Sequence, residues 1–112
     1  MKDTVILVTA NGMGHADESL GQMLFGKYVE LLLQNGEVPS AICFYTEGVK
    51  LVCEGSMVLE GLRQLESKGT RLIICSTCLN YFELTTKVQV GLIGGMGDIL
   101  EAQTKAEKVI TI

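Results

Sequence analysis

The stretch Thr4–Thr9, with the sequence TVILVT, decides the fold class of this chain. It is apolar and rich in β-branched residues and carries no charge, which is typical of a strand buried on both faces of a parallel sheet. Further stretches of similar character follow at wide intervals, so we expect five strands in all. The other four are Ala41–Tyr45, Arg71–Cys75, Val90–Ile93 and Lys108–Ile112.

A long helical pattern separates the first two of these strands. It follows a loop that contains Gly12 and Gly14, and Asp17 is well placed to cap the helix. Asn35-Gly36 is a typical helix end. Apolar residues recur along the helix at a spacing that predicts a core-facing stripe. They are Leu20, Met23, Leu24, Tyr28, Leu31 and Leu32.

Cap residues indicate the later helices. Val49–Cys53 is expected to form a short helix, and Ser56 is expected to cap a longer one that closes at Gly69. A loop and a helical stretch are expected over residues 76–87. Asp98 is expected to cap the helix that precedes the last strand.

Alternation of strands and helices predicts right-handed crossovers, and therefore an α/β fold with a mainly parallel five-stranded sheet and helices on both faces. With 112 residues, we expect one domain that spans residues 1–112. Ligands of such sheets bind beyond the carboxyl ends of the strands. The loops Ala10–Ala16, Thr46–Gly48 and Cys75–Cys78 should meet there, so we expect the functional site at this edge.

Charge and hydropathy restrict the partners. A net charge of −4 argues against nucleic acid, because phosphate binding needs clustered Lys and Arg. The chain has neither an apolar run of roughly 18 residues nor a signal-peptide pattern, so we expect a cytoplasmic protein that does not bind membranes. Hydrophobic residues make up 47% of this short chain, which favours a homo-oligomer that covers some of them.

The segment Cys75-Ser76-Thr77-Cys78 joins the end of a strand to the start of a helix. Backbone N–H groups at that position favour a thiolate, so we expect a lowered thiol pKa. A thiolate attacks persulfides and disulfides, which fits sulfur transfer or thiol exchange. The alternative is that both cysteines simply pack in the core, as cysteines often do. Cys43 and Cys53 lie in apolar stretches and are expected to fill the core.

Metal and nucleotide sites have weaker support. One C-x-x-C motif and a single histidine do not complete a zinc site, so we expect no metal and no cofactor. Gly12 and Gly14 are not followed by the third glycine of a dinucleotide fingerprint, because Asp17 occupies that position. His15 stands in the first loop, either as a solvated residue or as a group that tunes a thiolate or donates to a bound anion.

Several short motifs taken together resemble the DsrE-like domain of YedF-type proteins, within the DsrE/DsrF/TusD-like family. The resemblance covers nearly the whole chain. The motifs that carry it are Val5–Thr9, Asp17-Glu18-x-Leu20-Gly21, Gly48–Leu51, Glu54–Ser56 and Cys75-x-Thr77-Cys78-Leu79-Asn80-Tyr81-Phe82.

This resemblance implies a three-layer Rossmann-like α/β/α sandwich whose members carry sulfur as a cysteine persulfide and form homo- or hetero-oligomers. YedF-type proteins are linked with selenium metabolism. The family placement matches the reactive cysteine to Cys75, which would accept sulfur in a cleft while Cys78 acts as the resolving thiol. Substrate contacts are expected from the three loops, at Asn11, Gly12, His15, Gly48 and Thr77.

Three functions therefore compete at this stage. The first is a sulfur-carrier or sulfurtransferase-like protein that uses Cys75 and Cys78 between a sulfur donor protein and an acceptor protein. The second is a non-catalytic DsrE-like binding module, and the third is a thiol-disulfide oxidoreductase. Four matters stay open: the donor protein, the acceptor protein, which of Cys75 and Cys78 takes up the sulfur, and the choice between sulfur and selenium.

Overall fold

The computed structural model describes residues 1–112 and contains one five-stranded sheet in the order β4-β3-β2-β1-β5. Every pair of neighbouring strands is parallel, which confirms the predicted sheet. The fourth strand lies slightly later than the sequence pattern indicated. The strands are β1 (Thr4–Val8), β2 (Ala41–Phe44), β3 (Arg71–Cys75), β4 (Leu92–Gly94) and β5 (Lys108–Thr111).

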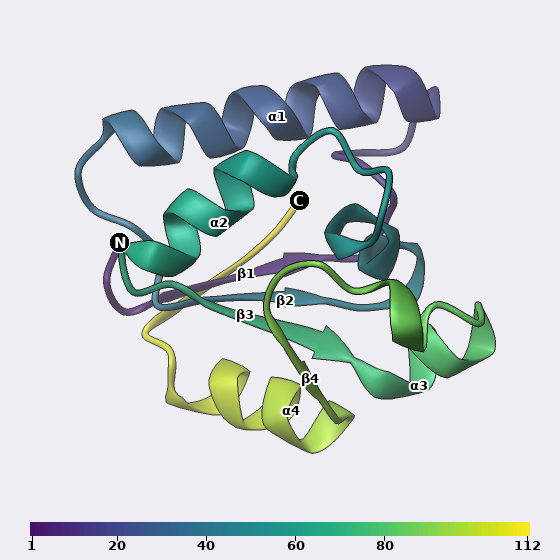
Figure 1. The fold of residues 1–112 in the computed structure, drawn as a ribbon. Helices are drawn as coiled ribbons and strands as arrows, with labels where there is room; N and C mark the ends of the chain where they lie inside the picture. Colours follow the sequence, from purple (N-terminus) through teal and green to yellow (C-terminus); the bar gives the residue numbers. More distant parts are fainter.

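Helices cover both faces of this sheet and complete an α/β fold (Figure 1). Two of them, α1 and α2, lie over one face, and α4 lies over the other. The segment expected to form a short helix after β2 is a 3-10 helix that begins earlier, at Thr46. The helices are α1 (Glu18–Gln34), α2 (Leu59–Ser67), α3 (Ser76–Tyr81) and α4 (Met96–Lys105), and the 3-10 helices are η1 (Thr46–Val52) and η2 (Thr85–Lys87).

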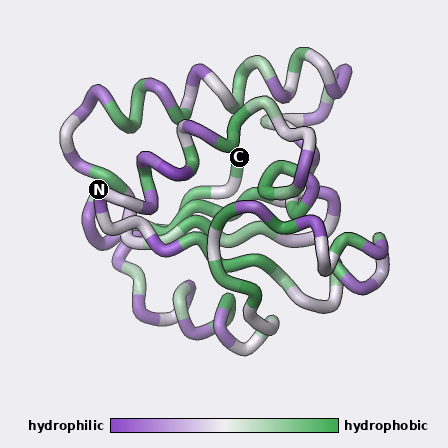
Figure 2. The backbone as a smooth tube through the Cα atoms, in the orientation of Figure 1, coloured by the Kyte–Doolittle hydropathy of each residue, from purple (hydrophilic) through white to green (hydrophobic).

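The apolar strands form the middle of the molecule, between the helical layers (Figure 2). Every residue of β1 and β2 is buried. Phe25 of α1 packs edge-to-face against Phe44 of β2, with ring centroids 6.5 Å apart. Burial of this continuous apolar layer fixes the strands, and the strand ends then fix the loops that follow them.

Both ends of α1 follow the prediction. The carboxylate of Asp17 accepts hydrogen bonds from the N–H groups of Ser19 at 2.9 Å and Leu20 at 3.3 Å. Gly36, just beyond the helix, has a φ of +81°, a conformation that glycine adopts without steric cost.

The predicted caps of the two later helices are wrong by a few residues. The Ser56 hydroxyl accepts a hydrogen bond from Val58 N at 3.3 Å, but α2 begins only at Leu59. Asp98 lies inside the first turn of α4 rather than before it, and its carboxylate accepts a bond from Gly95 N at 2.8 Å. Both side chains accept a hydrogen bond from a backbone N–H near the start of a helix, but neither occupies the cap position that was predicted for it.

The predicted core face of α1 is also wrong. The buried residues of α1 are Gly21, Phe25, Val29 and Leu32, so Leu32 was assigned correctly, and Tyr28 packs partly buried against the core. Leu24 is 45% exposed and Leu31 is 62% exposed. The helix carries apolar residues on two sides, and Phe25 offers the larger surface to bury. An apolar stripe is therefore left in water.

None of the helices combines the length and the hydropathy that a membrane span requires.

Candidate functional site

The three loops predicted to form the site do meet at the carboxyl edge of the sheet. Thr46 follows β2 and joins the other two loops. Its hydroxyl donates to the carbonyl oxygen of Thr9, which follows β1. Its backbone N–H donates to the sulfur of Cys78, in the first turn after β3, with N and Sγ 3.0 Å apart.

Thr46 has an uncommon backbone conformation for a β-branched residue. Its φ is +48°, in the left-handed region. Besides the bond to Thr9, its hydroxyl lies 2.7 Å from the carbonyl oxygen of Tyr45. Tyr45 in turn donates its N–H to Val8 O at 3.1 Å. The residue that contacts the Cys78 sulfur is therefore tied to the ends of both β1 and β2.

The two cysteines of the C-x-x-C motif have different exposures. Cys75 ends β3 inside the apolar core and is 1% exposed. Cys78 is half-buried in α3, one turn further along. The expectation that Cys75 faces an open cleft is wrong, because the last residue of a strand covered on both faces is still in the core. Cys78 is the more exposed member of the pair.

The predicted lowering of the thiol pKa is not found at Cys78. Burial raises the pKa of this thiol above its ordinary value, and the neighbouring Cys75 thiol raises it further. The N–H of Thr46 acts in the opposite sense and lowers it, because a hydrogen bond to sulfur favours the thiolate. Burial is the largest of these effects, so the net shift of the Cys78 pKa is upward.

Two glycines allow the loops to approach each other closely. Gly12 has a φ of +147°, and a Cβ there would lie 2.6 Å from the carbonyl carbon of Gly21 in α1. At Gly48 a Cβ would collide with the carbonyl oxygen of Val8, at the end of β1. Gly48 was predicted to contact substrate, and the structure gives it a packing role between η1 and β1.

A polar cavity of about 440 Å³ lies beside this edge of the sheet. It contains three of the predicted substrate contacts, Asn11, Gly12 and His15, and Glu47 closes it from η1. The fifth predicted contact, Thr77, is exposed on α3. Neither cysteine of the motif lines this cavity. His15 is exposed, as expected for a solvated loop residue.

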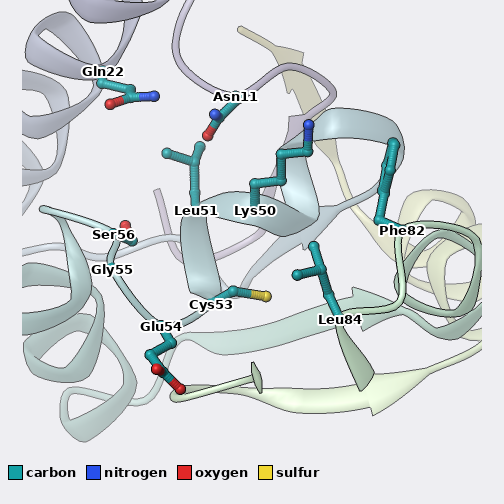
Figure 3. Close-up of a pocket in the computed structure, with 10 residues that line it drawn as sticks. All are labelled: Asn11, Gln22, Lys50, Leu51, Cys53, Glu54, Gly55, Ser56, Phe82 and Leu84. Carbon is teal, nitrogen blue, oxygen red and sulfur yellow. The ribbon is translucent and has the colours of Figure 1, made fainter. Parts of the chain in front are cut away.

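A second cavity, of about 430 Å³, opens between η1, α1 and the chain after α3 (Figure 3). Lys50 and Phe82 stand on one side of it, and the Lys50 ammonium lies 4.7 Å from the centre of the Phe82 ring. Lys50 is also paired with Glu47 at 2.9 Å. The cavity is lined by Asn11, Gln22, Lys50, Leu51, Cys53, Glu54, Gly55, Ser56, Phe82 and Leu84.

The remaining two cysteines fill the core, as predicted. Cys43 is fully buried in β2, and burial raises its pKa to about 11 although the charge of Arg71 opposes the shift. Cys53 is 3% exposed, and its thiol donates to Val49 O at 3.2 Å. No group of three or more histidine, cysteine, aspartate and glutamate side chains is arranged to hold a metal ion.

Sequence reasoning missed Thr46 as an individual residue, although it placed the loop correctly. Nothing in the letters Tyr-Thr-Glu-Gly signals a left-handed threonine, because β-branched residues rarely adopt that conformation. Lys50 and Phe82 belong to motifs of the family resemblance, but the sequence did not indicate that the two side chains touch. Their contact depends on how η1 packs on α3, which no local pattern reports.

Comparison with known proteins gives a family for this chain. Residues 7–112 match the DsrE/DsrF-like family. The chain belongs to this family. A search of curated proteins found no match. The family assignment confirms the resemblance inferred from the motifs, at the level of the DsrE/DsrF-like family as a whole.

Solved structures have the same fold as this DsrE/DsrF-like chain. The ychN protein from E. coli aligns over 100% of both chains, with a TM-score of 0.71 and 18% sequence identity. MTH1491 from Methanobacterium thermoautotrophicum, a protein of unknown function, aligns over 97% of both chains, with a TM-score of 0.72 and 20% identity. BT1422 from Bacteroides thetaiotaomicron, also of unknown function, covers 98% of this chain and 95% of its own, with a TM-score of 0.68 and 18% identity.

Proposed function

We propose that this protein is a sulfur carrier in which Cys78 accepts a sulfane sulfur and Cys75 is the resolving thiol. One observation carries the proposal: the half-buried sulfur of Cys78 accepts an N–H bond from Thr46 while the buried Cys75 thiol stands beside it. These roles are the reverse of those expected from the sequence. Membership of the DsrE/DsrF-like family supports the choice of sulfur chemistry.

Loading needs no external oxidant. The Cys78 thiolate attacks the outer sulfur of a donor persulfide, so that a new bond forms from Cys78 Sγ to that sulfur. The S–S bond of the donor breaks, and the donor leaves as a thiolate that takes up a proton. Delivery is the same exchange in reverse, because an acceptor thiolate attacks the outer sulfur and Cys78 leaves as a thiolate.

Cys75 gives the loaded protein a second route. Its thiolate attacks Cys78 Sγ, expels the outer sulfur as hydrosulfide and leaves a disulfide between the two cysteines. Cys75 is 1% exposed inside the apolar core, so its sulfur has little freedom to move toward the attacking position. We therefore expect this route to be slower than delivery to an acceptor.

Persulfide loading of single variants tests the proposal. Intact-mass spectrometry after incubation with a persulfide donor should show one added sulfur on wild-type protein and on Cys75→Ser, which should also hold that sulfur longer. Cys78→Ser should not load, whereas Cys43→Ser and Cys53→Ser serve as matched controls and should load normally. Loading that survives in Cys78→Ser but disappears in Cys75→Ser would restore the roles expected from the sequence.

The closeness of Cys75 and Cys78 also favours a second candidate, a thiol-disulfide oxidoreductase. In that case the pair would cycle between dithiol and disulfide at a measurable potential without retaining sulfur. Titration of the pair against a dithiol buffer, followed by mass spectrometry, separates the two functions. If the protein neither loads sulfur nor forms the disulfide, the non-catalytic binding module is the better description.

The setting of the proposed function follows from the composition and the surface. Four free cysteines suit a reducing compartment, which supports a cytoplasmic location for the proposed carrier. Donor and acceptor proteins would meet it at the Cys78 edge of the sheet. The exposed apolar side of α1 supports a homo-oligomer. Whether the cargo is sulfur or selenium depends on these partners, since both elements undergo the same exchange.

A further inference from the structure

We propose that Thr46 is a positioning residue for Cys78: its side-chain hydroxyl fixes its own backbone so that its N–H stays directed at the Cys78 sulfur. The inference rests on the proposed function only in taking Cys78 as the reactive thiol. On this inference, the Cys78 thiolate is stabilised by a backbone N–H group whose direction is set by a side chain outside the C-x-x-C motif.

The left-handed conformation of Thr46 needs an explanation. An L-residue in this region places its Cβ too close to the following carbonyl oxygen, and a β-branched side chain makes the conformation rarer still. Glycine would remove that cost, yet threonine stands here with a φ of +48°. Its single hydroxyl proton is directed at Thr9 O and lies close to Tyr45 O as well, so one shared donor bond offsets the cost and ties the residue to the end of β1. Glycine could not provide this connection.

The orientation matters because the N–H bond favours one protonation state of sulfur. A hydrogen bond to an anion is stronger than one to a neutral acceptor, so the Thr46 N–H stabilises the Cys78 thiolate more than the thiol. Few groups around Cys78 act against its thiolate. Burial and the Cys75 thiol disfavour the thiolate, and α3 carries no charged residue.

The nearby charged side chains do not replace the Thr46 N–H. On η1, Glu47 and Lys50 are paired with each other at 2.9 Å. In the first loop, His15 is exposed, and the Asp17 carboxylate is bound to the first turn of α1. Thr46 N–H is therefore the one group in contact with Cys78 that favours the thiolate.

Three substitutions separate the hydroxyl from the rest of the residue. Thr46→Ser keeps the hydroxyl, Thr46→Val keeps the shape without it, and Thr46→Gly adopts the left-handed conformation freely but has no side chain. The measurement is the rate of iodoacetamide alkylation at Cys78 from pH 6 to pH 10, with the label located by fragmentation of the peptide. Thermal unfolding of each variant reports whether it is folded.

We expect the serine variant to follow the wild-type profile. The valine and glycine variants should react about tenfold more slowly than wild type at each pH between 6 and 8, since loss of a charge-assisted hydrogen bond lowers the thiolate population by about a factor of ten or more. Thr104→Val is the matched control, because Thr104 also donates to a backbone carbonyl, Leu100 O at 2.8 Å, but in α4. It should leave the profile unchanged.

Wild-type profiles in both the glycine and the valine variants would overturn the inference, and so would a serine variant that reacts as slowly as the valine variant. If the valine variant does not fold, the glycine variant decides alone. Failure of the sulfur-carrier proposal is a separate result, because it appears as absent persulfide loading in wild-type protein whatever the alkylation profiles show.

Discussion

Gly48→Ala is the substitution for which the structure gives the clearest expected cost. The added Cβ would collide with the carbonyl oxygen of Val8, lie 2.8 Å from its carbonyl carbon and lie 3.3 Å from its Cγ1. Val8 is fully buried in β1, and its carbonyl oxygen accepts the N–H of Tyr45, so the strand cannot move aside cheaply. Overpacking of this kind costs roughly 1–3 kcal/mol. We expect a value near the upper end, because the nearest atoms belong to backbone.

Urea unfolding at equilibrium measures this loss. With a denaturant dependence of roughly 1–3 kcal/mol per molar urea, a loss of about 3 kcal/mol should lower the midpoint by about 1–3 M. Gly97→Ala is the matched control, because Gly97 lies in α4 with no atom within 4 Å of the added Cβ. Alanine there should stabilise the protein by roughly 0.5–1 kcal/mol. Equal midpoints for Gly48→Ala and wild type would refute the packing role of Gly48.

Three further outcomes are expected. The pKa of Cys43 is raised from its ordinary value of 9.0 to about 11, so between these values the native state keeps a proton that the unfolded chain loses. The free energy of unfolding should therefore fall as the pH rises from 9 to 11. Unfolding measured across that range should show a less steep fall in Cys43→Ala. Asp17→Ala should reduce the free energy of unfolding by about 1 kcal/mol in urea titrations, through loss of the α1 cap, whereas an unchanged value would contradict the role of this cap. Sedimentation equilibrium should show a homo-oligomer that Leu24→Glu or Leu31→Glu dissociates, and a wild-type monomer at tens of micromolar would disprove this expectation.

The strands show how far the sequence alone predicts this fold. Uninterrupted apolar runs such as Val5–Val8 are nearly incompatible with anything but a buried parallel strand in a chain this short, so the sheet followed directly. Helix α1 shows the limit. Its apolar residues lie on two sides, and the core selects the side with Phe25 because that side fits over β2. Periodicity in one helix cannot report which side has a partner.

The candidate site shows the same limit at smaller scale. The three loops could be placed together because parallel strands bring their carboxyl ends to one edge. The difference in exposure between Cys75 and Cys78 could not be predicted, since it depends on whether the last residue of β3 still lies inside the core. The contact between Thr46 and Cys78 joins residues 32 positions apart through an uncommon backbone conformation. Such a contact is visible only once the elements are packed.

The location of a single sulfur atom on wild-type protein tests the central claim most directly. After brief exposure to a persulfide donor and alkylation of the remaining thiols, trypsin should release the peptide Leu72–Lys87, which contains both cysteines of the motif. Its fragment ions separate Cys75 from Cys78. We predict that the added sulfur lies on Cys78, with a Cys75–Cys78 disulfide as the only later product. Sulfur found on Cys75 at the earliest times, or on neither residue, would contradict the assignment of Cys78 as the acceptor.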